Sequence, residues 1–348
     1  MGSSTIRAAV IGATGYTGSE LIRLLRQHPL CEIILVTSES RDGDVIGDIH
    51  THYSNVRDIT AEPMESFSSS EVDVVFLALP HGVSMEFVAD YGLGVARVID
   101  LSGDFRLSSA EVYRSWYGME HRCPEHMEEA VYGMPELFAD EIAGASLVAN
   151  PGCFPTSVIL PLAPLLREGL LASEGICADS KTGVSGAGAK ARQKTHFPEV
   201  FGNFTPYALC NHRHTPEMQE VLGAYAGREP SVLFTPHLLP VDRGILSTIY
   251  ARPAETGLSR QRIMDCLTEA YGDRYFVRLL GHPMGVKHVR GSNFVDIFAD
   301  WDDRTETAVI VSSIDNLVKG AAGQAVQNMN LMFDLPEETG LKALPLHP

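Results

Sequence analysis

The sequence predicts an α/β protein: a Rossmann-type dinucleotide-binding domain and a second, α+β domain with a mixed, largely antiparallel sheet. Near the N-terminus a short apolar strand leads through a glycine-rich turn into a helix, and further short apolar strands alternate with helical segments. Later segments are longer and alternate apolar with polar residues, as half-buried strands do. At 348 residues the chain is too long for one ordinary core. We expect one domain at 1–150, joined by a C-terminal helix at 316–348, and another at 151–315.

Composition and charge exclude several classes of protein. Apolar residues make up 45% and aromatics 8%, which is typical of a folded globular chain. Asp and Glu number 44 against 27 Lys and Arg, a net charge of −17 that repels polyanions, so we expect no nucleic-acid partner. No apolar run approaches the roughly 18 residues of a membrane span, and the N-terminus lacks a signal pattern. The six cysteines show no C-x-x-C spacing, which is typical of reduced thiols; we expect a cytoplasmic protein with no membrane partner.

The first element is the strand 6–11, which runs directly into a glycine-rich turn at 12–18 and then into a helix. The glycines follow the spacing G-x-x-G-x-x-G rather than G-x-G-x-x-G. Both spacings let backbone without a Cβ approach a pyrophosphate, whose charge then meets the helix N-terminus. We predict a dinucleotide site here, with a purely structural turn as the alternative. Its residues are Gly12, Thr14, Gly15, Tyr16, Thr17 and Gly18.

The second strand, 32–36, ends in residues that bear on the choice of cofactor. A lone acid such as Glu39 favours the ribose diol of NAD, whereas Ser38 followed by Arg41 suits the 2′-phosphate of NADP. We favour NADP(H). The alternative is that Arg41 is a solvated loop charge.

The next two apolar strands also end in polar residues, at the edge where ligands bind in such sheets. Pro80 and His81 follow the strand 72–79, and Ser102 and Arg106 follow the strand 98–101. We expect His81 to lie near the cofactor rather than to act as a catalyst. For Arg106, binding of a phosphate or carboxylate and a structural ion pair both remain open.

Cys153 lies between an apolar strand at 145–149 and a proline-interrupted apolar helix at 158–166, with an Asn-Pro-Gly turn before it. At a helix start, backbone N–H groups and the helix dipole favour thiolate over thiol, which makes a nucleophile near neutral pH. The alternative is a small core residue. Cys153 is therefore a candidate nucleophile.

After Cys153 the pattern changes to that of an α+β domain. A strand at 176–180 leads into a glycine-rich loop at 181–190 that carries two lysines. Alternating strands follow at 231–238, 244–250, 275–280 and 292–299, with a helix at 259–271. The exposed sheet face suits a subunit interface. A final helix rich in small residues can pack closely, which favours contact with the first domain.

A covalent thiol mechanism needs an acid/base within hydrogen-bond reach. The stretch 210–218 concentrates titratable groups just before a helix, whose expected cap is Thr215. His212 and His214 face the same side if the segment is extended. The Cys-x-His-x-His spacing also resembles zinc ligation, but it lacks a convincing fourth ligand, and we expect no metal.

Six motifs together give the chain a resemblance to one family over nearly its whole length. They are Gly12–Leu21, Asp100–Leu107, Tyr132–Glu136, Asn150–Thr156, His212–Glu217 and Lys319–Ala325. The chain resembles the N-acetyl-gamma-glutamyl-phosphate reductases of arginine biosynthesis, in the semialdehyde dehydrogenase superfamily. Gly103 is a small departure, because alanine is expected there.

The resemblance implies an NADPH-dependent enzyme that reduces N-acetyl-gamma-glutamyl phosphate to N-acetylglutamate 5-semialdehyde. Cys153 would attack the small acyl phosphate and carry a thioester, His214 would handle protons with His212 as the other candidate, and Glu217 would orient a histidine. Expected substrate contacts are Arg106, Lys181, Ser185 and Lys190, and Asn316 is expected at the cofactor. A homodimer or homotetramer formed through the second domain is also implied.

Two alternatives remain open on the sequence. The chain is also compatible with a related acyl-phosphate reductase, either aspartate semialdehyde dehydrogenase or the aminoadipyl analogue of lysine biosynthesis. A non-catalytic NADP-binding sensor is the alternative from a different class, although Cys153 together with His214 disfavours it.

Overall fold

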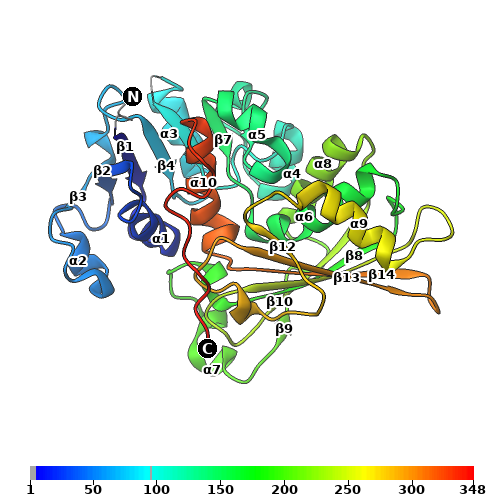
Figure 1. Ribbon diagram of the computed structural model, residues 1–348. Coiled ribbons are helices and arrows are strands. Elements are labelled where there is room, and N and C mark those ends of the chain that lie inside the picture. The colour runs from blue at the N-terminus through cyan, green and yellow to red at the C-terminus, as the bar shows by residue number, and fades with distance from the viewer. Residues whose placement is uncertain (1–4, 95) are drawn as a thin grey trace. The chain divides into compact units, whose positions relative to one another are not determined.

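Two seven-stranded sheets organise the chain in the computed structural model, which describes residues 5–94 and 96–348 (Figure 1). Each sheet belongs to its own compact unit. The first unit contains the residues up to Pro151 together with Ala321–Lys342, and the second contains Gly152–Gly320 with Ala343–Pro348.

The sheet of the first unit has the strand order β3-β2-β1-β4-β5-β7-β6, and all its neighbouring strands run parallel. The order reverses direction between β1 and β4, and such a switch point is where doubly wound sheets bind ligands. The strands are β1 (Ile6–Ile11), β2 (Cys31–Thr37), β3 (Ala61–Glu62), β4 (Val74–Leu77), β5 (Arg97–Asp100), β6 (Val131–Tyr132) and β7 (Leu147–Ala149).

The helices of this unit connect successive strands, as parallel pairing requires. The α-helices are α1 (Tyr16–Leu25), α2 (Ile46–Ile49), α3 (Val83–Tyr91), α4 (Ala110–Tyr117), α5 (Pro135–Gly144) and α10 (Gly323–Met332). Short 3₁₀ turns are η1 (Thr51–Tyr53), η2 (Met64–Ser66) and η3 (Pro124–His126).

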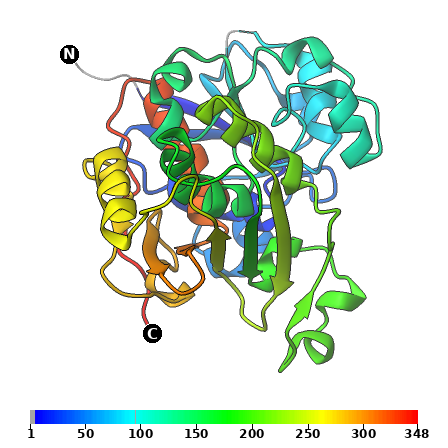
Figure 2. The same cartoon turned by 90° about the vertical axis from the view of Figure 1, so that its right-hand side faces the viewer.

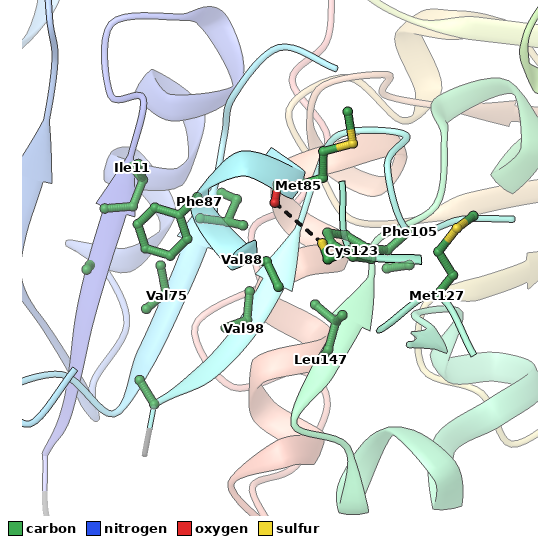
Figure 3. Packing of buried hydrophobic residues seen from close by; sticks show 14 of the residues in the cluster. Ile11, Val75, Met85, Phe87, Val88, Val98, Phe105, Cys123, Met127 and Leu147 are labelled. Atoms are coloured by element: carbon green, nitrogen blue, oxygen red, sulfur yellow. Dashed lines mark hydrogen bonds between the residues drawn. The ribbon is translucent and has the colours of Figure 1, made fainter. Parts of the chain in front are cut away.

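The core of the first unit explains why its strands are apolar without alternation. All four residues of β4 are buried, as expected for a parallel strand covered on both faces. Figure 3 shows Phe87 and Val88 of α3 against Val75 and Val98 of the sheet. Burying a phenylalanine or valine side chain fully stabilises the fold by about 1.5–3 kcal/mol.

The C-terminal helix differs from its predicted extent of 316–348. A π-helical turn, η7 (Val318–Ala322), precedes α10, and the helix ends at Met332. Asp334 adopts a φ of +55°, and Pro336 follows, so the chain cannot continue as a helix. Within the first unit α10 packs against α1 and α5. The last residues belong to the second unit, where the Leu346 N–H donates to the Arg290 carbonyl oxygen at 2.8 Å.

The sheet of the second unit has the order β12-β13-β14-β11-β8-β10-β9 and mixes both pairings. The pairs β8–β10 and β12–β13 are parallel, and the other neighbours are antiparallel. The strands are β8 (Ile176–Thr182), β9 (Thr205–Pro206), β10 (Val232–Leu238), β11 (Ile245–Ala251), β12 (Val277–Leu279), β13 (Val295–Asp302) and β14 (Thr307–Ile314).

Three helices pack on this sheet: α6 (Cys153–Arg167), α8 (His214–Ala226) and α9 (Arg260–Tyr271). Alternate residues of β8 are buried, which leaves the other face of that strand partly accessible. The segment with η4 (Val184–Ala187), η5 (Gln193–Thr195) and α7 (Phe197–Val200) extends away from the sheet (Figure 2). The turn η6 (Val286–His288) precedes β13.

Strand β14 was not predicted, because its residues lie next to the small-residue stretch that we took for the start of the last helix. Ile310 and Ile314 are buried in β14, which pairs with both β11 and β13. In the part of the chain that the structure describes, no helix is both long and apolar enough to cross a membrane.

Candidate active site and cofactor loop

The glycine-rich turn after β1 requires glycine at two of its three glycine positions. Gly12 has a φ of +91°, and a Cβ there would lie 2.6 Å from the Ala78 carbonyl oxygen. A Cβ on Gly18 would lie 2.5 Å from the Gly12 carbonyl oxygen. A Cβ on Gly15 would meet nothing within 4 Å. The loop is therefore tightly folded at both ends and open at its centre.

Helix α1 begins at this open centre, and its N-terminus suits an anion. No side chain caps it, and its first turn contains no acidic residue. The first N–H groups of a helix lack intrahelical partners and carry the positive end of the dipole. Thr17 lies in this first turn, Thr14 precedes the cap residue Gly15, and Tyr16 is 45% exposed. These residues fit the pyrophosphate of a dinucleotide.

The three polar residues predicted to choose between NAD and NADP, which follow β2, each have a different partner. Ser38 is buried, and its N–H donates to the Glu62 carbonyl oxygen at 2.9 Å. A carboxylate oxygen of Glu39 accepts from the Met64 N–H at 3.1 Å. The exposed Arg41 forms an ion pair with Asp44. The Met64 N–H thus binds the carboxylate of Glu39, the acid that favours NAD, and the Arg41 guanidinium is exposed to solvent.

The polar residues after β4 and β5 hold two turns together. His81 accepts the Gly103 N–H at Nδ1, with a distance of 2.8 Å. The Ser102 hydroxyl donates to Asp100 at 2.8 Å. Burial, and next the nearby Asp104, raises the pKa of Asp100 to about 6. Pro80 accepts the Val83 N–H at the start of α3. Pro80, His81 and Ser102 therefore lie within one region of the first unit.

Arg106 is buried, and its guanidinium donates to two backbone carbonyl oxygens. Nε donates to Asn150 and Nη2 to Leu101, each at 2.9 Å. The structural role left open by the sequence was an ion pair. The contacts observed here anchor the guanidinium to the backbone.

Cys153 is the first residue of α6, and the strand β7 ends four residues before it. The strand-to-helix turn predicted from the sequence is confirmed, although the helix begins earlier than 158. Cys153 is half-buried, and no side chain caps α6 at Gly152. A Cβ on Gly320 would lie 2.7 Å from the Cys153 Cβ. The backbone of η7 therefore lies directly beside the candidate nucleophile.

The two candidate histidines lie together beside the residue that follows the thiol. The Phe154 ring centroid lies 5.6 Å from that of His212 and 6.0 Å from that of His214, and the two imidazoles are 4.8 Å apart. The His214 N–H donates to His212 Nδ1 at 3.1 Å. The segment is not extended, because the chain turns just before α8, and the predicted helix cap at Thr215 is wrong, because α8 already begins at His214. The turn nevertheless brings the rings together.

His212 is a half-buried neutral imidazole. Burial, and secondarily the neighbouring Arg213, lowers the pKa of His212 to about 4. Its Nδ1 accepts a hydrogen bond, so the proton of the neutral ring is on Nε2. The ring packs between Phe154, Tyr207 and Phe234. These contacts favour a structural role for His212, and proton transfer by His214 stays a prediction.

This burial predicts a pH dependence of stability. An unfolded histidine titrates near pH 6.5, so the unfolded chain binds the extra proton between pH 6.5 and about 4. Stability present above pH 6.5 is therefore lost as the pH falls through about 4, by up to about 3 kcal/mol. Urea unfolding measured from pH 7 to about 4 should give a free energy of unfolding that falls with pH, and His212→Asn should make this fall less steep. The exposed His282→Asn is the control, and an unchanged slope in His212→Asn would contradict the assignment.

Glu217 is fully buried in α8, and its Oε1 accepts the Gly152 N–H at 2.8 Å. The carboxylate thus holds the backbone immediately before Cys153. Its expected role in orienting a histidine stays a prediction.

Glu217→Ala should destabilise the protein by about 1–3 kcal/mol, because it leaves the Gly152 N–H buried without this acceptor. Glu217→Gln retains an acceptor oxygen and should cost less. Chemical denaturation of both variants checks this. Equal losses in the two variants would show that the acceptor oxygen is not what Glu217 contributes.

Two of the substrate contacts predicted on the glycine-rich loop of the second unit, Lys181 and Ser185, each bind another side chain. Lys181 contacts Asp179 at 2.7 Å. Asn316 donates to the Ser185 hydroxyl at 3.0 Å and accepts the Gly244 N–H at 2.8 Å. Lys190 is exposed on the loop. Asn316 and Ser185, predicted for different ligands, are thus one hydrogen-bonded pair.

Sequence reasoning missed two neighbours of Cys153. Gly320 lies within a motif that carried the family resemblance, so its position was available as a signal. Tyr207 gave no signal of its own. Burial, and then the nearby Cys153 sulfur, raises the pKa of the Tyr207 phenol. Within residues 5–94 and 96–348, no cluster of His, Cys, Asp and Glu could hold a metal ion.

Family models match both halves of the chain. Residues 7–145 match "Semialdehyde dehydrogenase, NAD binding domain", and residues 153–316 match "Semialdehyde dehydrogenase, dimerisation domain".

Curated relatives match nearly end to end. The chain is 50% identical over 347 residues to an N-acetyl-gamma-glutamyl-phosphate reductase of Magnetococcus marinus, covering 99% of each chain. It is 49% identical over 343 residues to the protein of the same name from Desulforapulum autotrophicum, covering 98% of this chain and 99% of the relative. A Methanosphaera stadtmanae protein of that name is 46% identical over 349 residues, covering 99% and 100%.

Solved structures of lower sequence identity share the fold. Aspartate semialdehyde dehydrogenase II of Vibrio cholerae superposes with a TM-score of 0.74 at 18% identity, covering 95% of this chain and 99% of that one. Aspartate semialdehyde dehydrogenase of Candida albicans, solved with NADP, gives 0.71 at 18% identity, covering 94% and 98%.

Proposed function

Because this chain belongs to the N-acetyl-gamma-glutamyl-phosphate reductase family of the semialdehyde dehydrogenases, we propose that it reduces N-acetyl-gamma-glutamyl phosphate to N-acetylglutamate 5-semialdehyde with NADPH. The observation that carries the proposal is 50% identity over 99% of both chains to a reductase of that name. The half-buried cysteine at the start of α6 supports it from the chemistry.

In the proposed reaction the Cys153 thiolate attacks the acyl carbon. The carbon–sulfur bond forms as the bond to phosphate breaks, and inorganic phosphate leaves with the electron pair. The product is a thioester on Cys153. The N-terminus of α6 favours the thiolate, and Glu217 keeps the preceding backbone in place through Gly152.

The residues of the first unit fit a dinucleotide. NADPH, when bound, supplies the hydride that reduces the thioester carbon. The open loop at Thr14–Thr17 would hold the pyrophosphate, Ser38 and Arg41 would hold the 2′-phosphate, and Pro80, His81 and Ser102 would line the same site. Asn316 stays a prediction as a cofactor contact.

His214 would protonate the oxygen of the reduced carbon and take that proton back as the thiohemiacetal collapses. The collapse releases the aldehyde and returns the thiolate of Cys153. Ser185 and Lys190, on the loop after β8, are proposed substrate contacts. Roles for Arg106 and Lys181 stay predictions, because their observed partners are backbone carbonyl oxygens and Asp179.

A steady-state assay in the direction of oxidation tests the proposal. N-acetylglutamate 5-semialdehyde, phosphate and NADP should yield NADPH only when all three are present. Faster turnover of aspartate or aminoadipate semialdehyde would assign the related reaction instead. NADP binding without turnover of any of the three aldehydes would favour a sensor.

We also propose that the second unit assembles homodimers or homotetramers in the cytoplasm. The match to a family model described as a dimerisation domain supports this. The sheet carries apolar side chains that remain exposed in the single chain, Leu233 at 55% and Tyr250 at 41%. Light scattering gives the oligomer number, and a monomeric mass would contradict the assembly.

A further inference from the structure

Helix α1 lacks the side-chain cap that usually holds a helix start in place. Its cap residue is Gly15, which has no side chain to accept a first-turn N–H. A Cβ at Gly15 would meet nothing within 4 Å. The open centre of the cofactor loop therefore needs support from elsewhere in the chain.

Three side chains from the turn η1 and the residue before it provide hydrogen bonds to this region. His50 Nε2 lies 2.9 Å from the Ala13 carbonyl oxygen, and the Tyr53 hydroxyl donates to the Ser19 carbonyl oxygen at 3.1 Å. His52 Nε2 lies 3.3 Å from the Ser19 hydroxyl. The bonded residues, Ala13 and Ser19, lie on either side of the open centre of the loop. The loop is thus held at both ends by one short segment.

The three side chains also pack on one another. The ring centroids of His52 and Tyr53 are 4.0 Å apart, and His50 lies 5.7 Å and 6.0 Å from them. Gly47 makes room for this turn, since a Cβ there would lie 2.7 Å from the Tyr53 carbonyl oxygen. Mutual packing restricts the rotamers of the three rings, so the hydrogen bonds to the loop cost less side-chain entropy.

The protonation state of His50 lets it donate a hydrogen bond to Ala13 that persists near pH 7. Its partner is a carbonyl oxygen, so Nε2 must carry a proton and donate. Burial is the main cause that lowers the pKa of His50, and the nearby His52 and Arg41 lower it further. The imidazole is therefore neutral near pH 7, with its proton on Nε2.

We propose that His50, His52 and Tyr53 are positioning residues for NADPH, because together they hold the glycine loop in the form that receives the pyrophosphate. This 50–53 clamp acts through Ala13 and Ser19 and does not itself take part in the chemistry. The inference rests on the proposed function only in taking NADPH as the cofactor. A preformed loop binds with less ordering entropy, so loss of the clamp weakens binding without slowing the reaction of bound substrate.

Direct titration of the full-length protein with NADPH, followed by fluorescence, tests the clamp. His50→Ala should raise the Kd and KM for NADPH by about tenfold, and Tyr53→Phe by about threefold, with kcat within about twofold of wild type. His50→Gln keeps an N–H donor and should restore much of the affinity. His126→Ala, which removes a half-buried histidine paired with Glu129, is the matched control.

The results separate this inference from the proposed function. If wild type binds NADPH and both Tyr53→Phe and His50→Ala bind it equally well, the clamp is wrong and the function stands. A loss of kcat with unchanged KM also overturns the clamp. If wild type itself does not bind NADPH, the proposed cofactor fails first. Tyr53→Phe removes a single oxygen atom, so this variant still tests the clamp if His50→Ala does not fold.

Discussion

Cys153→Ser should lower the phosphate-dependent oxidation of N-acetylglutamate 5-semialdehyde by about 10⁴-fold or more. A serine hydroxyl stays protonated near neutral pH, so it attacks poorly. In this direction phosphate must attack the acyl-enzyme. An ester on serine reacts less readily than a thioester, because the alkoxide is the poorer leaving group. The steady-state rate of NADPH formation measures the loss.

The fold should survive this change, because one oxygen replaces one sulfur at a half-buried position. Cys266→Ser, at another half-buried cysteine, in α9, is the matched control and should keep wild-type activity. Mass spectrometry of wild type mixed with the acyl phosphate, in the absence of NADPH, should show one acyl group on Cys153. Turnover of Cys153→Ser within tenfold of wild type would rule out the covalent scheme.

His214→Asn should lower kcat by about 10²- to 10⁴-fold, the usual contribution of a positioned acid/base. Asparagine retains hydrogen-bonding capacity but cannot exchange a proton at neutral pH. The pH–rate profile of the variant should lose the ionisation that belongs to His214.

His212→Asn separates the two histidines. Its imidazole is half-buried and accepts the His214 N–H, so the variant should lose stability and change kcat far less than His214→Asn. Both variants are compared by kcat and by urea unfolding. A larger loss of kcat in His212→Asn than in His214→Asn would exchange the two roles.

Local sequence was sufficient for the elements that short-range physics decides. Spacing alone located β1, the glycine turn and α1, because backbone approach and positive φ demand glycine at Gly12. The turn before Cys153 was equally local, since Asn-Pro-Gly breaks the chain between an apolar strand and an apolar helix. Family motifs then identified the chemistry, which the strand and helix pattern could not.

Other features depended on segments far apart in sequence. Strand β14 was missed because its pairing with β11 and β13 decides that it is a strand, and periodicity could not separate it from a helix start. The last helix stops short because Asp334 takes a positive φ ahead of Pro336, which outweighs the continuing sequence.

The sequence by itself determined the α/β plan with two sheets, the glycine-rich loop and the place of Cys153 at a helix start, because each is encoded in a few neighbouring residues. Only the tertiary structure decided that Glu217 holds Gly152, that Gly320 lies against Cys153 and that His212 packs among aromatic rings. Those facts depend on which surfaces pack together. Burial and long-range hydrogen bonds distinguish the environments of the two histidines, and no spacing along the chain specifies either.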